Sequence, residues 1–306
     1  MPSKTQLEQL LGSQDIVEQV SLIEQLNQGM FLPQTLTEVA QYLREHCLKV
    51  PGIAPEAVDI VGTGGDGANT LNFSTLAAMV AAKAGANIVK NGNKSTTSLC
   101  GSFDLLQELG VLIPETPEQA QVIFQKEHCV FLFAPYFHPI MAKVAAARKV
   151  LKERGEKTIF NCIGPLVNPS FNRRIVAGVF TPKLIVPYAQ TLLNLGFTHA
   201  YVFYGDGLDE LSLTGITHFA RLAEGKIEYG ELRPADLNLP ACQLEELVGG
   251  DAKQNAYEAR LLLAGKLPGP KTNMVLANAA AALQVESGFK LNWSEAINKV
   301  KEVLDA

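Results

Sequence analysis

Two adjacent carboxylates, Asp209 and Glu210, are the first residues whose types suggest chemistry. They end the segment Gly205-Asp-Gly-Leu-Asp-Glu210, which follows the apolar run Tyr201–Phe203. Neighbouring carboxylates repel each other unless a cation lies beside them, and Mg²⁺ is usually bound by one or two carboxylates together with substrate phosphates. A solvated acidic turn is the alternative, and it is the commoner explanation for an isolated Asp-Glu pair. The pair therefore indicates a metal site if phosphate-binding segments accompany it.

A glycine-rich segment suited to phosphate binding, Gly62-Thr-Gly-Gly-Asp66, follows the apolar run Val58–Val61. Glycines let backbone N–H groups approach a phosphate closely because no Cβ intervenes. A little further on, Asn72-Phe-Ser-Thr75 predicts the start of a helix. Ser74 is expected to cap this helix, whose N-terminus would favour an anion. A plain tight turn is the alternative for the glycine segment.

A second polar segment, Lys90–Asp104, follows the apolar run Asn87–Val89. It contains two lysines, two asparagines, four hydroxyl side chains at positions 95–98 and the dipeptide Gly101-Ser102. Cations and neutral donors together can wrap a polyanion. An exposed polar loop with an Asn-Gly turn is the alternative.

A possible anchor for a second substrate lies in the middle of the chain. His138 precedes Pro139, and Arg148 follows ten residues after His138. If a helix begins at Pro139, four residues recur at roughly helical steps: Met141, Val144, Ala145 and Arg148. His138 could then contact an aromatic substrate, and Arg148 could bind its carboxylate with two parallel hydrogen bonds. The alternatives are a core histidine and a surface arginine.

The elements that position these residues follow from the pattern of apolar residues. Residues 1–50 predict helices only, and residues 253–305 return to helix. Between them, short and continuously apolar runs alternate with helical stretches, which indicates a mostly parallel sheet buried between helices. The predicted fold class is α/β, with a small helical domain at 1–55, a helical return to it at about 139–155, and a large α/β domain at 56–306. Ligands bind beyond the carboxyl ends of strands in such sheets, where the polar segments lie.

Composition restricts the possible functions. The chain has 306 residues, of which 47% are hydrophobic and 19% charged, and its net charge is −5. A nucleic-acid-binding protein usually carries a basic excess, so that role is not favoured. The five cysteines form no CxxC pair, which suits reduced thiols. We see no signal-peptide pattern and no apolar run near the ~20 residues needed to span a bilayer. A soluble cytoplasmic protein is expected.

Seven motifs together resemble the anthranilate phosphoribosyltransferase family, from about residue 57 to the C-terminus. They are GTGGD at 62–66, NFST at 72–75, K-x-GN at 90–93, GS-x-DLL-x-ELG at 101–110, FLFAPYFHP at 131–139, TIFN-x-x-GPL-x-NP at 158–169 and DGLDE at 206–210. The resemblance implies an enzyme of tryptophan biosynthesis that transfers phosphoribosyl from phosphoribosyl pyrophosphate to the amine of anthranilate and releases pyrophosphate. It also implies a Mg²⁺ requirement and a homodimer formed through the helical domain.

The resemblance also implies residue roles. Binding of phosphoribosyl pyrophosphate is expected at Gly62, Thr63, Gly64, Gly65, Asp66, Asn72, Ser74, Thr75, Lys90, Asn91, Gly92, Asn93 and Ser102. Anthranilate is expected at Gly62, Asn93, His138, Arg148 and Pro165. Mg²⁺ is expected at Ser74, Asp209 and Glu210. No residue is assigned as a catalytic acid, base or nucleophile; Lys90, Asp209 and Glu210 are expected to act by electrostatics and positioning.

Three departures from the family pattern lie toward the acceptor side. Asn91 stands where the family usually has histidine, the helical N-terminus is shorter than usual, and the link Lys152–Glu156 is slightly longer. Three alternatives remain. One is a pyrimidine nucleoside phosphorylase, which shares the general architecture. Another is a non-catalytic, nucleic-acid-binding relative of the family. The last is a transferase that uses a different aromatic amine.

Overall fold

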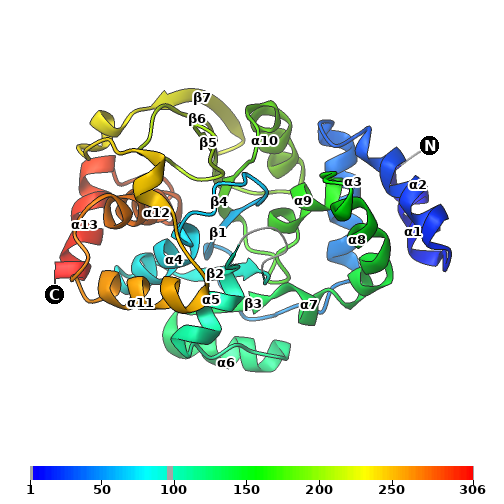
Figure 1. Ribbon diagram of the computed structural model, residues 1–306, viewed down its shortest axis with the longest axis horizontal. Helices are drawn as coiled ribbons and strands as arrows, with labels where there is room; N and C mark the ends of the chain where they lie inside the picture. The colour runs from blue at the N-terminus through cyan, green and yellow to red at the C-terminus, as the bar shows by residue number, and fades with distance from the viewer. Residues whose placement is uncertain (1–2, 95–98, 306) are drawn as a thin grey trace.

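A seven-stranded sheet forms the centre of the computed structural model, which describes residues 3–94 and 99–305 (Figure 1). The four hydroxyl residues predicted to help bind phosphate, 95–98, lie outside the described residues. The strand order is β3-β2-β1-β4-β5-β6-β7. The strands are β1 Val58–Gly62, β2 Ile88–Gly92, β3 Cys129–Phe133, β4 Arg174–Gly178, β5 His199–Gly205, β6 Thr217–Ala223 and β7 Lys226–Leu232.

The first five strands are parallel, and β6 and β7 extend the sheet as an antiparallel hairpin. The five strands predicted from apolar runs are confirmed, whereas the β6–β7 hairpin was not predicted, because its residues alternate in burial and lack a continuous apolar run. The chain proceeds from β1 to β3 on one side of β1 and resumes with β4 on the other side. Such a reversal creates a crevice at the carboxyl ends of the strands.

Helices cover both faces of the sheet, which explains why the parallel strands are continuously apolar. One face packs against α4 Phe73–Lys83, α5 Ser102–Leu109, α11 Ala252–Leu263, α12 Pro270–Glu286 and α13 Trp293–Asp305. The other face packs against α10 Ile185–Asn194, and α9 Ile159–Ile163 belongs to the same apolar cluster. This cluster continues into α1 Ser3–Gly12, α2 Ile16–Asn27, α3 Pro33–Glu45 and α8 Ala145–Glu153, while α6 Pro117–Glu127 and α7 Ala134–Phe137 lie beside β3. The α/β fold is thus confirmed.

The N-terminal helices and α8 lie together at one end of the molecule (Figure 1). The helix predicted from Pro139 is present, with a 3₁₀ turn at Pro139–Val144 leading into α8. Leu36 of α3 and Leu151 of α8 belong to the same apolar cluster as Ile175 of β4. The helical segments therefore pack on each other and on the sheet, and a domain boundary near residue 55 stays a prediction. Among the described residues, no helix is both long and apolar enough to span a membrane.

Candidate active site

Three glycines at the ends of adjacent strands make room for the carboxylate pair. A Cβ placed on Gly178, at the end of β4, would lie 1.6 Å from the backbone oxygen of Asp209. A Cβ on Gly62 of β1 would lie 2.2 Å from the Asp209 Oδ2, and one on Gly205 of β5 would lie 2.4 Å from the Glu210 backbone oxygen. The 205–210 segment thus crosses the carboxyl edge of the sheet in direct contact with the strands.

The glycine-rich loop after β1 is held by the same segment. Gly64 N–H donates to the Asp209 Oδ2 at 2.6 Å, and Thr63 N–H donates to the Gly178 carbonyl at 3.0 Å. Gly64 and Gly65 have φ values of +70° and +83°, in the left-handed region that side chains disfavour. Gly64 is exposed and Gly65 partly exposed. This conformation leaves the loop backbone open to an anionic ligand.

The carboxylate pair faces the first turn of α4. Glu210 Oε1 accepts the Ser74 N–H at 3.1 Å, so the glutamate lies at the helix N-terminus. The prediction that Ser74 caps the helix is wrong: α4 begins at Phe73, so Ser74 lies inside the first turn, and its hydroxyl lies 3.2 Å from the Lys90 Nζ. The side chain of Asn278 in α12 fixes the adjacent Leu211 backbone: its Oδ1 accepts the Leu211 N–H, and its Nδ2 donates to the Leu211 carbonyl.

Burial disfavours the ionised forms of Asp209 and Glu210. Burial, reinforced by the negative charge of Asp66, raises the pKa of Asp209 to about 7. Burial and the charge of Asp209 raise the pKa of Glu210 to about 8, and Lys90 opposes this shift. A divalent cation between the two carboxylates would favour their ionised forms.

Lys90 and Asp59 are both buried behind the site, and each acts electrostatically on the other without lying within ion-pair distance. Lys90 is 2% exposed and donates to the Ile60 carbonyl, while Asp59 is fully buried. Asp59 accepts hydrogen bonds from the Asn91 N–H and from the Asn168 side chain, the latter at 2.8 Å. Burial raises the pKa of Asp59 to about 7, and the positive charge of Lys90 partly opposes this shift. Burial lowers the pKa of Lys90, and the negative charge of Asp59 partly opposes that shift. Neither Asp59 nor Asn168 was given a role from the sequence, although Asn168 lies in the motif at 158–169.

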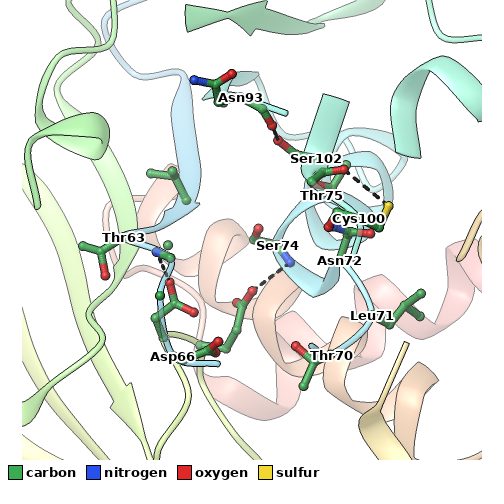
Figure 2. Close-up of a pocket in the computed structure, with 18 of the residues that line it drawn as sticks. Thr63, Asp66, Thr70, Leu71, Asn72, Ser74, Thr75, Asn93, Cys100 and Ser102 are labelled. Carbon is green, nitrogen blue, oxygen red and sulfur yellow. Dashed lines mark hydrogen bonds between the residues drawn. The ribbon is translucent and has the colours of Figure 1, made fainter. Parts of the chain in front are cut away.

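A cavity of about 280 Å³ opens between the glycine loop, α4 and the end of β2. Figure 2 shows Thr63 and Asp66 on one side of it and Asn72, Ser74 and Thr75 on the other. Every residue predicted to bind the donor or Mg²⁺ lines this cavity: Gly62, Thr63, Gly64, Gly65, Asp66, Asn72, Ser74, Thr75, Lys90, Asn91, Gly92, Asn93, Ser102, Asp209 and Glu210. The structure therefore brings together segments that are up to 148 residues apart, from Gly62 to Glu210.

A second, more apolar cavity of about 420 Å³ lies beside the first. All five residues predicted for the acceptor line it: Gly62, Asn93, His138, Arg148 and Pro165. The Arg148 guanidinium lies 5.4 Å from the centre of the Phe160 ring, and burial lowers the pKa of Arg148. In the described part of the chain no carboxylate lies within ion-pair distance of Arg148. The cavity thus presents an unpaired cation beside an aromatic ring.

His138 lies in the wall of the second cavity and is 4% exposed. Neither ring nitrogen has a partner with hydrogen-bond geometry among the described residues. Burial lowers the pKa of His138 to about 4, although the Val167 backbone lies near enough to oppose the shift. The imidazole is therefore neutral at pH 7, and it can contact an aromatic ring without adding charge.

The two cavities share a wall. Gly62, Thr63, Asn91 and Asn93 line both of them. Ligands in the two cavities would therefore meet at the ends of β1 and β2. The short helix α9 and the turn after it supply four acceptor-cavity residues that lie in the motif at 158–169 but were given no role from the sequence: Phe160, Asn161, Ile163 and Gly164.

The acidic residues suit a magnesium ion that shares its ligands with a phosphate compound. Asp209 and Glu210 supply carboxylate oxygens, and Ser74 supplies a hydroxyl in the same cavity. No cluster of three or more His, Cys, Asp or Glu residues with metal-binding geometry occurs among residues 3–94 and 99–305. A magnesium ion here would take its remaining ligands from phosphate oxygens and water, as this ion commonly does.

The fold and the site define a glycosyltransferase. Residues 54–306 match the family model described as "Glycosyl transferase family, a/b domain". An anthranilate phosphoribosyltransferase from Methanosarcina acetivorans is 39% identical over 275 residues, which cover 90% of this chain and 73% of the relative.

Solved structures agree with this assignment. The anthranilate phosphoribosyltransferase of Thermus thermophilus matches with a TM-score of 0.90 and 35% identity, over 99% of this chain and 89% of the other. The Saccharomyces cerevisiae enzyme in complex with PRPP and Mg matches with a TM-score of 0.88 and 28% identity, over 99% and 89%. The same yeast enzyme in complex with 4-fluoroanthranilate matches with a TM-score of 0.86 and 27% identity, over 99% of this chain and 88% of the other. The chain belongs to the anthranilate phosphoribosyltransferase family.

Proposed function

We propose that the protein transfers the phosphoribosyl group of phosphoribosyl pyrophosphate to the amine of anthranilate, as a step in tryptophan biosynthesis. One observation carries the proposal: a phosphate-type cavity with two acids and a glycine-rich loop shares a wall with an apolar cavity that contains an unpaired arginine. A polyphosphate donor and an aromatic carboxylate match these two cavities in chemistry. The relatives' names and complexes point to the same pair of substrates.

The donor cavity is proposed to stabilise the leaving pyrophosphate. In the reaction the amine nitrogen bonds to the ribose carbon, and the bond from that carbon to the pyrophosphate oxygen breaks. The electron pair leaves with pyrophosphate, and the nitrogen loses a proton to solvent. Lys90 and the Gly65 N–H of the loop line this cavity and are suited to bind the growing negative charge, whereas the Gly64 N–H is bonded to Asp209.

Asp209, Glu210 and Ser74 are proposed to hold Mg²⁺. When bound, the ion supplies positive charge next to the pyrophosphate oxygens. The protein's own part is to fix the carboxylates, which the glycines at the strand ends and Asn278 accomplish.

The acceptor cavity is proposed to orient anthranilate. Arg148 binds the carboxylate, while neutral His138 and Pro165 flank the ring. An aryl amine is neutral and nucleophilic at pH 7, so no strong general base is needed. Holding the amine in line with the ribose carbon supplies the orientation part of the rate enhancement.

Three wider features belong to the same proposal. The helical segments 1–55 and about 139–155 form a domain that closes over the substrates and excludes water. Two copies of the chain pair through this domain. All five cysteines are free, which suits a reducing compartment such as the cytoplasm.

The test is to mix the protein with phosphoribosyl pyrophosphate, Mg²⁺ and anthranilate and to follow anthranilate fluorescence. Loss of fluorescence that requires both the donor and Mg²⁺ is the expected result. Donor binding without fluorescence loss would favour a different amine as acceptor. Absence of donor binding, together with a salt-dependent shift of labelled single-stranded DNA, would favour the non-catalytic alternative. Phosphorolysis of thymidine or uridine would favour the phosphorylase.

A further inference from the structure

Lys157 reaches from the segment before α9 to the glycine-rich loop. Its Cε lies 3.4 Å and its Nζ 3.8 Å from the point where a Cβ on Gly65 would be. The Nζ also lies 4.0 Å from the centre of the Phe180 ring. Lys157 is exposed, and no carboxylate among the described residues lies within ion-pair distance of it. The ammonium group is therefore positioned by the protein but not neutralised by it.

The place of this ammonium group suits an anion in the donor cavity. Gly65 lines that cavity. The Phe180 N–H donates to the Thr63 Oγ1 at 3.1 Å, so a hydrogen bond fixes Phe180, whose ring contacts Lys157, to the same loop. A cation that stacks on an aromatic face keeps its outer N–H groups available. Lys157 does not itself line the cavity, but its Nζ approaches it at Gly65. A phosphate oxygen bound at the Gly65 N–H could accept a charge-assisted hydrogen bond from this ammonium group.

Lys157 also connects the donor loop to the acceptor cavity. The next residue, Thr158, is the N-cap of α9, and its N–H donates to the Asn161 Oδ1 at 2.8 Å. Asn161 and Phe160 line the acceptor cavity. Lys157 thus directly precedes the helix that supplies part of the acceptor wall.

We propose that Lys157 binds the pyrophosphate group of the donor and thereby couples donor binding to acceptor affinity. The proposal rests on the proposed transferase function. It adds a donor contact supplied by the segment that builds the acceptor wall. Because coupling between two binding sites is reciprocal, donor and acceptor should each raise the affinity for the other.

The first experiment titrates inorganic pyrophosphate with Mg²⁺ into the protein by calorimetry. Lys157→Met keeps the apolar stem on Phe180 but removes the charge, and it should raise the Kd about tenfold, as expected for the loss of a hydrogen bond to a charged group. Lys157→Arg should stay within about threefold of the parent, since it keeps the charge. Lys152→Met removes an exposed lysine on α8 and should leave the Kd unchanged.

The second experiment titrates anthranilate with and without saturating magnesium pyrophosphate. In the parent, pyrophosphate should lower the Kd for anthranilate. In Lys157→Met the Kd for anthranilate should be nearly the same with and without pyrophosphate. The Kd measured without pyrophosphate should equal that of the parent. A merely structural role would instead weaken anthranilate binding in both conditions.

Parent-like pyrophosphate affinity in Lys157→Met, or an equal loss in Lys152→Met, would overturn the assignment of Lys157 and leave the proposed function intact. Equal anthranilate affinity with and without pyrophosphate in the parent would overturn the coupling. A parent protein that binds no pyrophosphate at all would overturn both this inference and the proposed function.

Discussion

The backbone oxygen of Asp209 lies against the Cα of Gly178, so closely that a Cβ at position 178 would stand 1.6 Å from it. The carboxylate pair can cross the end of β4 only because this strand ends in glycine. Gly62 gives the Asp209 side chain room in the same way on β1. The proposed metal site therefore depends on residues that have no functional group of their own.

Gly178→Ala should push the 209–210 segment away from the sheet. Because backbone atoms would have to move, we expect a loss of about 1–3 kcal/mol in the free energy of unfolding and a higher Mg²⁺ concentration for half-maximal activity. Denaturant melts and Mg²⁺ titrations measure these changes. Gly12→Ala is the control, since nothing lies within 4 Å of a Cβ at that position. A Gly178→Ala protein with parental Mg²⁺ dependence would contradict the proposed positioning.

Arg148→Gln should raise the KM for anthranilate about 10- to 100-fold with a smaller effect on kcat, because a charged hydrogen-bond donor to the acceptor carboxylate is lost. The KM for the donor should not change. Steady-state kinetics with each substrate varied in turn measure the split. Arg154→Gln, at a half-exposed arginine paired with Glu24 just after α8, is the matched control. Aniline lacks the carboxylate, so the kcat/KM for aniline should be the same in Arg148→Gln and the parent. A lower kcat/KM for aniline in Arg148→Gln would contradict the assignment.

His138 should make the protein sensitive to acid. Its pKa is about 4 in the folded state and about 6.5 when unfolded. Between these values only the unfolded chain binds the proton, so stability is fully present above pH 6.5 and is lost as the pH falls toward 4. The decrease in the free energy of unfolding that is due to His138 should reach roughly 3 kcal/mol.

Urea unfolding at a series of pH values measures this effect. His138→Gln should show a shallower decline than the parent over the same window, whereas exposed His46→Gln should follow the parent. Identical slopes for the parent and His138→Gln would show that the imidazole is not buried as the structure describes.

The Asp59–Lys90 pair should show strong energetic coupling. Asp59→Ala removes a negative charge that favours the charged form of buried Lys90 and leaves the Asn168 side chain without one acceptor, so it should lower the free energy of unfolding by about 1–3 kcal/mol. Adding Lys90→Met should recover part of this loss, because the uncompensated charge is gone. Chemical denaturation of the parent, the two single variants and the double variant completes the cycle. Strict additivity of the two single effects would contradict the coupling.

The sequence predicted much of the site because each motif directly follows a short apolar run. Parallel strands end at one edge of a sheet, so Gly62, Lys90, His138 and Asp209 were expected near one another from their order in the chain. The prediction that Ser74 caps α4 was wrong, since the sequence does not show which residue of Asn72–Thr75 begins the helix. The roles of these residues in binding, and the domain and dimer proposals, stay predictions until they are measured.

By itself, the sequence determined the fold class, the five parallel strands and the polar segments that line the two cavities, since burial periodicity and residue type are local properties of the chain. Only the tertiary structure decided that the two cavities share a wall, that Gly178 makes room for Asp209, that Asp59 lies with Lys90, and that Lys157 reaches Gly65. These relationships join segments distant in the chain. They depend on packing geometry, which no local pattern of residues records.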